Sequence, residues 1–190
     1  MPGYAVSGVG MVMCSRHSLV RKNAVGDLQK GERYVLSLNS FYWYTENSPR
    51  YCNMDYIILL ALVGATLLRI VITYDIACQW IKNFLRGMEA FPDHMKLPDK
   101  TKIDAAIPSW HINGHGESCR QNFSLGYLDG VGRTCGEEIE TGWSHTNPLA
   151  SSVREMGPAA RHDTLNDHWN GWNFWKIVGF SASVVILLVL

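Results

Sequence analysis

The sequence predicts a mixed α/β fold with a helical C-terminal part, and three observations support this prediction. A short β-branched run at residues 69–73 indicates a buried strand. In the segment that follows it, apolar residues recur every four positions, which indicates a helix with one apolar face. Residues 160–178 have a second helical pattern. The chain has 190 residues, 47% of them hydrophobic, which is enough for one ordinary domain with a core.

The N-terminal third contains one predicted strand and one predicted helix. Residues 3–13 are small, apolar and partly β-branched, so we expect a buried strand that ends at the polar run 14–18. Residues 26–33 are polar and predict a connection. From residue 55 to 68 the apolar residues continue for almost four turns, which favours a buried helix. The strand at 69–73 follows this helix.

Asp75 stands between the predicted strand and the next predicted helix. A carboxylate in this place lies at the carboxyl edge of a sheet, where the active sites of α/β folds gather. The alternative is that Asp75 only caps the helix. The apolar stripe of that helix consists of Ile76, Trp80, Phe84 and Met88.

The second half of the chain is richer in turns. Residues 92–108 form a polar segment bounded by prolines, which predicts a linker, and residues 111–121 predict a short helix. A glycine-rich turn is expected at 126–136 and a helix start at 137–143. The last helix is predicted at 160–178.

Composition limits the classes of function. Lys and Arg together number 17, as do Asp and Glu, so the chain has no net positive field that would attract phosphates. This argues against a free-standing DNA-binding module of high affinity, but not against a catalytic domain. Five scattered cysteines without a signal peptide favour a reducing, intracellular compartment with thiols that are free or bound to metal.

A group of potential zinc ligands lies in the predicted helix 111–121. His111, His115 and Cys119 are spaced four apart, so a helix would place them on one face. This suits three ligands of a Zn²⁺ site, with Cys78 or Cys135 as the fourth. The alternatives are partly buried histidines around an inert thiol, or side chains that position nucleic acid.

The C-terminal residues 177–190 are apolar and raise the question of a membrane anchor. As a helix these 14 residues span about 21 Å, whereas a bilayer core needs roughly 30 Å. We therefore expect a buried strand or a misread end of the coding sequence. A small tail-anchored membrane protein is the alternative, with Trp172, Trp175 and Lys176 at the interface.

Two segments have distinctive sequences: YDIACQW at residues 74–80 and IPSWHINGHGESC at 107–119. Both resemble the fungal KDZ (Kyakuja-Dileera-Zisupton) transposases, and the resemblance continues in the same order over nearly the whole chain. Its other segments are residues 8–10, 14–17, 27–34, 130–134, 136–137, 140–143, 147–152, 154–158, 161–165, 172–173 and 176–179.

The resemblance implies an RNase H-like catalytic core in a nuclear protein that acts on the DNA of transposon ends. In such a core two Asp and one Glu hold Mg²⁺ or Mn²⁺ for strand cleavage and transfer, and hard cations prefer carboxylate oxygens. Carried over by motif, Asp75 is the second acid and Glu140 the third, with Glu137 as its rival. The alternative for Glu137 and Glu140 is the acidic first turn of a helix.

Several departures from the family pattern predict a partial and inactive domain. The family's first acid precedes the motif at residues 8–10, and this chain begins after it. Cys135 stands where the family has Asp, and Thr141 where it has Arg. A non-catalytic DNA-binding or interaction relic is therefore the alternative function. The resemblance predicts no oligomeric state.

The resemblance also predicts the domain organisation. Residues 1–179 would be the partial catalytic domain, interrupted at 36–52 by an insertion of 17 residues that matches neither flank. We hypothesise that this insertion is translated intron. Residues 180–190 would be an apolar tail outside the family pattern.

Overall fold

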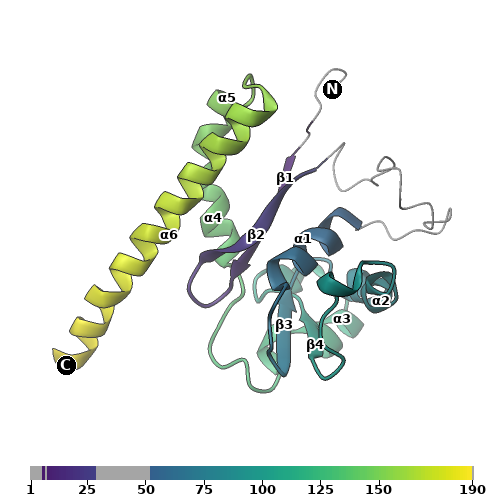
Figure 1. The fold of residues 1–190 in the computed structure, drawn as a ribbon. Coiled ribbons are helices and arrows are strands. Elements are labelled where there is room, and N and C mark those ends of the chain that lie inside the picture. The colour runs from purple at the N-terminus through teal and green to yellow at the C-terminus, as the bar shows by residue number, and fades with distance from the viewer. Residues whose placement is uncertain (1–5, 7, 29–51, 190) are drawn as a thin grey trace. The chain divides into compact units, whose positions relative to one another are not determined.

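The structure, a computed structural model, describes residues 6, 8–28 and 52–189, with side chains described up to residue 180. Residues 36–51 of the predicted insertion lie outside these ranges. The chain divides into two compact units, whose elements are labelled in Figure 1. Unit 1 comprises the described parts of residues 1–12 and 21–136, and unit 2 comprises those of residues 13–20 and 137–190.

A parallel pair of strands lies at the centre of unit 1. β3 (Arg69–Thr73) pairs with β4 (Lys102–Ala106) in a two-stranded sheet, with Arg69 opposite Lys102 and Thr73 opposite Ala106. The strand predicted at 69–73 is confirmed. The linker predicted at 92–108 is wrong where β4 forms. That strand is short and carries Lys102 and Asp104, so its sequence lacks the apolar run that marks β3.

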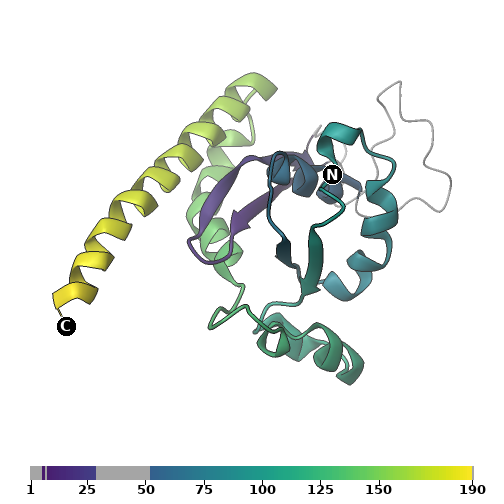
Figure 2. The same ribbon diagram turned by 60° about the horizontal axis from the view of Figure 1, so that its bottom comes forward.

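The helix α2 (Ala77–Met88) connects the two strands, as a parallel pair requires a crossover. Figure 2 shows β3 and β4 side by side, with α2 beside them. The apolar stripe predicted for this helix is confirmed, because Trp80 and Phe84 are both 1% exposed. A short 3-10 helix, η1 (Asp93–Met95), follows α2 before the chain enters β4.

The helix α1 (Cys52–Leu62) precedes β3 and is shorter than the helix predicted at 55–68. It ends before Gly64, which has φ +77°, a left-handed conformation that often follows the last turn of a helix. Leu67 and Leu68 are exposed to 55% and 70%, so their apolar character does not reflect helical burial.

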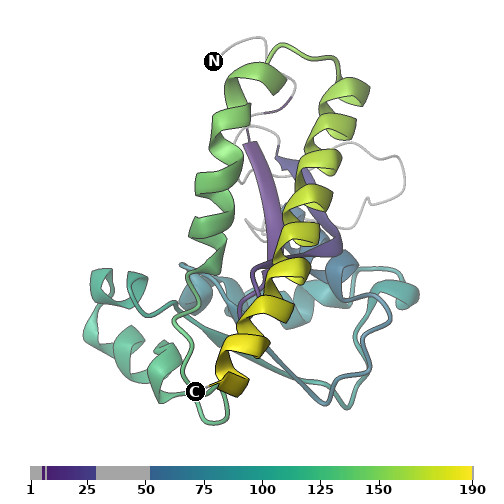
Figure 3. The same cartoon turned by 90° about the vertical axis from the view of Figure 1, so that its left-hand side faces the viewer.

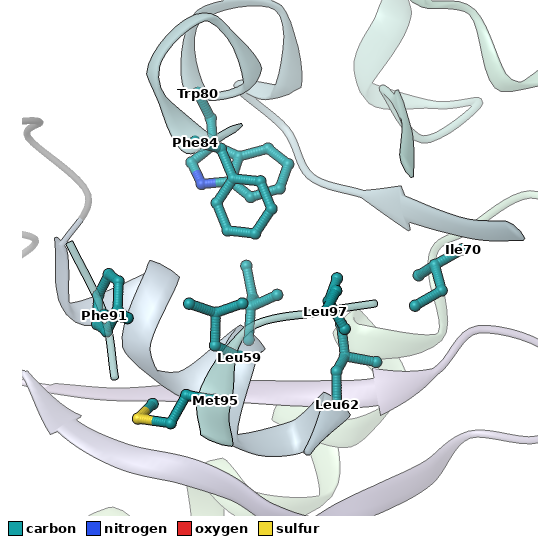
Figure 4. Close-up of a cluster of buried hydrophobic side chains, with 9 residues drawn as sticks. Leu59, Leu62, Ile70, Trp80, Phe84, Phe91, Met95 and Leu97 are labelled. Atoms are coloured by element: carbon teal, nitrogen blue, oxygen red, sulfur yellow. The ribbon is translucent and has the colours of Figure 1, made fainter. Parts of the chain in front are cut away.

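The main hydrophobic core of unit 1 packs α1 against α2, β3 and the segment between α2 and β4. Figure 4 shows Trp80 and Phe84 of α2 above Leu59 of α1. Leu59 is fully buried. The buried members of this core are Ile58, Leu59, Leu62, Ile70, Trp80, Phe84, Phe91, Met95 and Leu97.

A second two-stranded sheet consists of β1 (Gly8–Cys14) and β2 (Leu19–Leu28). The strand predicted at 3–13 is confirmed over the described part. β2 was not predicted, and the polar connection predicted at 26–33 is wrong for its first three residues. In unit 1, Gly10 allows α1 to come close, since a Cβ there would lie 2.9 Å from Ile57 Cδ1.

Three short helices follow β4, and the first two include residues of the distinctive segment 107–119. The chain forms the 3-10 helix η2 (His111–Gly114), then α3 (Glu117–Phe123) and the 3-10 helix η3 (Leu125–Tyr127). The helix predicted at 111–121 is thus interrupted, because His115 and Gly116 have extended backbone. The glycine-rich turn at 126–136 is confirmed, with positive φ at Gly130, Gly132 and Gly136.

Unit 2 is mainly helical. α4 (Glu138–Thr146) leads through η4 (Asn147–Leu149) and α5 (Ala150–Val153) into α6 (Pro158–Val189). Figure 3 shows α4 and α6 running antiparallel, joined at one end by the segment that contains α5. The helix starts predicted near 137 and 160 are confirmed. No helix in the described part of the chain has an apolar stretch long enough to cross a bilayer.

Polar contacts in unit 2 join α6 to the tip of the β1–β2 hairpin. The Asn173 amide accepts a hydrogen bond from the Val20 N–H and donates one to the Val20 carbonyl, both at 2.9 Å. Trp172 Nε1 donates to the Ser18 carbonyl at 2.6 Å. These bonds occupy backbone groups at the tip.

The described strands and helices confirm the mixed α/β fold with a helical C-terminal part. An RNase H-like core stays a prediction.

Candidate functional site

Asp75 lies where the sequence predicts it, just beyond the end of β3. The Tyr74 N–H donates to the Ala106 carbonyl at 3.0 Å, which extends the pairing of β3 and β4 by one step. Asp75 then leaves the sheet, and Ile76 occupies the N-cap position of α2. Asp75 is therefore not the capping residue. Its side chain is 50% exposed, so the carboxylate is available at the carboxyl end of both parallel strands.

The structure places His111 beside Asp75. The distance between His111 Nε2 and Asp75 Oδ2 is 3.6 Å. His111 opens η2, and its ring contacts the ring of Trp110 edge to face at 5.5 Å between centroids. The spacing of four residues predicted His111 on one helical face with His115 and Cys119. In the structure, the extended backbone at His115 separates His111 from His115 and Cys119.

Of the predicted ligands, His115 and Cys119 come together with Cys78 instead. Atoms of Cys78, His115 and Cys119 that can bind a metal all lie within 4.8 Å of one another. Cys78 Sγ is 3.8 Å from His115 Nδ1. Among the described residues, this is the group of three or more potential ligands that could hold a metal ion. The sequence prediction named all three residues, but gave Cys78 only as one of two choices for the fourth ligand.

The Cys–His cluster, defined as Cys78, His115 and Cys119, rests on a small apolar core. Cys78 lies in the first turn of α2 and is 6% exposed, packed with Ala77, Ile107 and Ile112. Burial raises the pKa of the Cys78 thiol above its ordinary value, and the adjacent Cys119 thiol raises it further. The Cys78 thiol in this setting resists ionisation, and a bound cation would remove that resistance.

An arginine that the sequence prediction missed holds the loop of the cluster. Arg120 Nε donates to the His115 carbonyl at 2.9 Å, and its Nη2 donates to the Asn113 carbonyl at 2.7 Å. The guanidinium thus bridges the end of η2 and the start of α3. The residue could not be selected from the sequence, because its partners are backbone groups whose positions depend on the break at Gly116.

The other predicted acids lie in unit 2. Glu140 is an exposed residue in the first turn of α4, and Glu137 occupies the N-cap position of that helix without a side-chain capping bond. An acidic first turn is favourable next to the positive end of a helix dipole. Asp75 belongs to unit 1, so a shared ion between Asp75 and Glu140 or Glu137 stays a prediction.

Cys135, the other fourth ligand named from the sequence, lies outside the Cys–His cluster. It is exposed, and its carbonyl accepts a hydrogen bond from the Ser109 N–H at 2.9 Å. The next residue, Gly136, has φ +74° and packs closely against Thr73 and Leu125. The glycine-rich turn therefore lies against the end of β3, near the backbone that leads to Asp75.

Comparison with known proteins identifies the family. No curated protein matches the chain, and no solved structure matches it. A family model described as Kyakuja-Dileera-Zisupton transposase matches residues 45–173, which is more than half of the chain. The matched range includes Asp75, the Cys–His cluster and the acidic start of α4. The chain therefore belongs to the Kyakuja-Dileera-Zisupton transposase family.

Proposed function

We propose that this chain is a transposase-derived domain whose ancestral reaction is metal-dependent cleavage and transfer of DNA strands. The observation that carries the proposal is the position of Asp75. It lies directly beyond β3, at the carboxyl end of two parallel strands, with half of its side chain exposed. A site of this kind can present a carboxylate to a divalent ion and to a substrate at once.

The proposed chemistry follows from the residue types. Mg²⁺ or Mn²⁺ would be held by Asp75 together with Glu140, or with Glu137 in its place. When bound, the ions supply activation of the attacking oxygen and stabilisation of the leaving oxygen. The residues of the chain supply the carboxylates and their positions. The RNase H-like core, DNA of transposon ends as the partner, and a nuclear location belong to this proposal.

We infer that the chain does not complete the reaction by itself. Cys135 stands where the resemblance predicts Asp, which removes a carboxylate beside the end of β3. Thr141 replaces an arginine that could bind phosphate through two N–H groups. The ionisable side chain that lies 3.6 Å from Asp75 is His111, which carries no carboxylate. The Cys–His cluster is proposed to hold zinc in a supporting role.

Manganese binding by the whole chain tests the role of Asp75. Asp75→Asn should weaken Mn²⁺ binding roughly tenfold or more, measured by electron paramagnetic resonance of free Mn²⁺. Asp99→Asn is the matched control, because Asp99 is an exposed acid in the loop before β4. Wild-type affinity in Asp75→Asn would refute the assignment. Glu140→Gln and Glu137→Gln identify the third acid by the same measurement.

A cleavage assay tests the inactivity separately. With Mn²⁺ and DNA of the transposon ends, the wild-type chain should produce no nicks. Nicking that disappears in Asp75→Asn would show an active enzyme and contradict the inference of inactivity, while supporting Asp75 as a ligand. DNA binding that persists unchanged in Asp75→Asn and without divalent ions would favour the non-catalytic DNA-binding relic.

A further inference from the structure

We infer that Cys78, His115 and Cys119 bind one zinc ion, which clamps the start of α2 to the η2–α3 segment. The inference extends the supporting role proposed above by fixing the ligand set. It replaces His111 with Cys78, and it excludes Cys135. The first of the three ligands lies in α2, and the other two lie on either side of the first residues of α3.

The separation of the three side chains suits a tetrahedral ion. With bond lengths of about 2.3 Å to sulfur and 2.1 Å to nitrogen, tetrahedral ligands lie about 3.6 to 3.8 Å apart. Cys78 Sγ and His115 Nδ1 are 3.8 Å apart, and every pair in the cluster lies within 4.8 Å. The ligands would therefore need to close by about 1 Å or less. A water molecule would complete the tetrahedron, as in other zinc sites with three protein ligands.

The donor set selects zinc over the hard cations. Two sulfur atoms and one imidazole nitrogen are soft or borderline ligands, which suit Zn²⁺ and not Mg²⁺ or Ca²⁺. The surroundings also fit a bound cation, because buried Cys78 and half-buried Cys119 are adjacent thiols on an apolar base. Zinc would bind both as thiolates and release their protons.

The clamp also explains the arrangement next to it. Asp75 lies three residues before Cys78, and His111 lies four residues before His115. The pair Asp75–His111 and the pair Cys78–His115 therefore link the same two segments, at 3.6 Å and 3.8 Å. Zinc bound to Cys78 and His115 would hold these two segments together, and so would also fix the positions of Asp75 and His111. The metal would thus act on Asp75 as a positioning device, without contacting it.

Zinc content of the whole chain tests the ligand set. The reduced chain is loaded with zinc, separated from free metal and analysed for zinc per chain. Wild type should retain one zinc, and Cys78→Ser, Cys119→Ser and His115→Ala should retain none. Cys135→Ser and His111→Ala are the controls and should retain one. Asp75→Asn should also retain one, so that failure of this inference is distinguishable from failure of manganese binding at Asp75.

Cobalt replacement gives a second measurement that does not depend on the folding of a Cys78 variant. Co²⁺ bound to wild type should show a thiolate-to-cobalt absorption band, and Cys119→Ser should show little of it, since this variant lacks one of the two thiolates and should not retain the metal. At free zinc 1,000-fold above its Kd, the ratio of folded to unfolded chain should rise about 1,000-fold.

Three results would overturn the inference. One is a wild-type chain that retains no zinc under reducing conditions. Another is loss of zinc in His111→Ala together with its retention in Cys78→Ser, which would restore the ligand set predicted from spacing. The third is a cobalt band whose intensity is unchanged in Cys119→Ser.

Discussion

The buried carboxylate of Asp55 should make the stability of the protein depend on pH. Asp55 lies in the first turn of α1 and is 1% exposed. Its Oδ1 accepts a hydrogen bond from Trp80 Nε1 at 2.6 Å, while its Oδ2 is buried without a hydrogen-bond partner among the described residues. Burial raises the pKa of Asp55 from 3.8 to about 6, although the bond from Trp80 acts in the opposite direction.

The sign and size of the effect follow from this pKa. The folded state binds the proton of Asp55 more tightly than the unfolded state, so the protonated form stabilises the fold at low pH. This contribution is complete below about pH 3.8 and is lost as the pH rises through about 6. The difference of about two pKa units corresponds to about 3 kcal/mol in the free energy of unfolding.

The substitution Asp55→Asn isolates this term. Asn keeps the oxygen that accepts from Trp80 and carries no charge, so its contribution does not change with pH. Its buried N–H groups cost about 1 to 3 kcal/mol at every pH. We therefore expect the free energy of unfolding of Asp55→Asn, relative to wild type, to rise by about 2.4 kcal/mol between pH 4 and pH 8, because the unfolded-state carboxyl is already partly ionised at pH 4.

Urea unfolding followed by tryptophan fluorescence at both pH values gives the two free energies for each chain. Asp99→Asn serves as the control, since an exposed acid should show a much smaller change. The reasoning would be refuted if the relative stability of Asp55→Asn were the same at pH 4 and pH 8 to within about 0.5 kcal/mol.

Two further predictions concern packing, and both are measured by urea unfolding. Leu59→Ala should lower the free energy of unfolding by about 2 to 5 kcal/mol, because Leu59 is fully buried in the core of unit 1. Leu67→Ala, at a 55% exposed residue, should change it by less than about 0.5 kcal/mol, and equal effects of the two would contradict the packing. Gly136→Ala should cost more than about 1 kcal/mol, because φ is +74° and the added Cβ would lie 3.0 Å from Leu125 Cδ2. A stable Gly136→Ala would argue against that backbone conformation.

The elements that could be predicted from the sequence are those whose burial follows a simple period. Residues 69–73 form β3 as predicted, and the stripe that contains Trp80 and Phe84 marks α2. β4 could not be predicted, because its five residues include Lys102 and Asp104. Asp104 is held by Arg69 of β3, a cross-strand ion pair that a reading of local sequence does not show.

The candidate sites differ in the same way: one depends on neighbouring residues in the sequence, and the other depends on residues far apart in it. The position of Asp75 depends on a strand and a helix that adjoin it, so the sequence placed it correctly. The Cys–His cluster depends on a contact between Cys78 and His115, which are 37 residues apart. The spacing of four residues suggested a helical face instead. Gly114 and Gly116, which flank His115, argue against a continuous helix there, because glycine weakens a helix.

The residues of the segment YDIACQW have different structural roles, which they fulfil by facing different sides of the turn between β3 and α2. Tyr74 continues the strand pairing through its N–H and packs its ring edge to face against Trp80, at 6.1 Å between centroids. Asp75 follows on the exposed side. Ala77 is fully buried, and a larger side chain there would displace Ile107 from the small core under the Cys–His cluster.

Trp80 completes this unit from the other side of α2. Its ring fills the main core and its Nε1 donates to Asp55, so the register of α2 is fixed by apolar and polar contacts together. With the register fixed, Asp75 and Cys78 must point towards the segment that carries His111 and His115. A shift of α2 by one residue would break the core contact, the Asp75–His111 pair and the cluster at once. The packing of α2 in the core and the placement of the candidate metal ligands therefore both depend on the same residues of this segment.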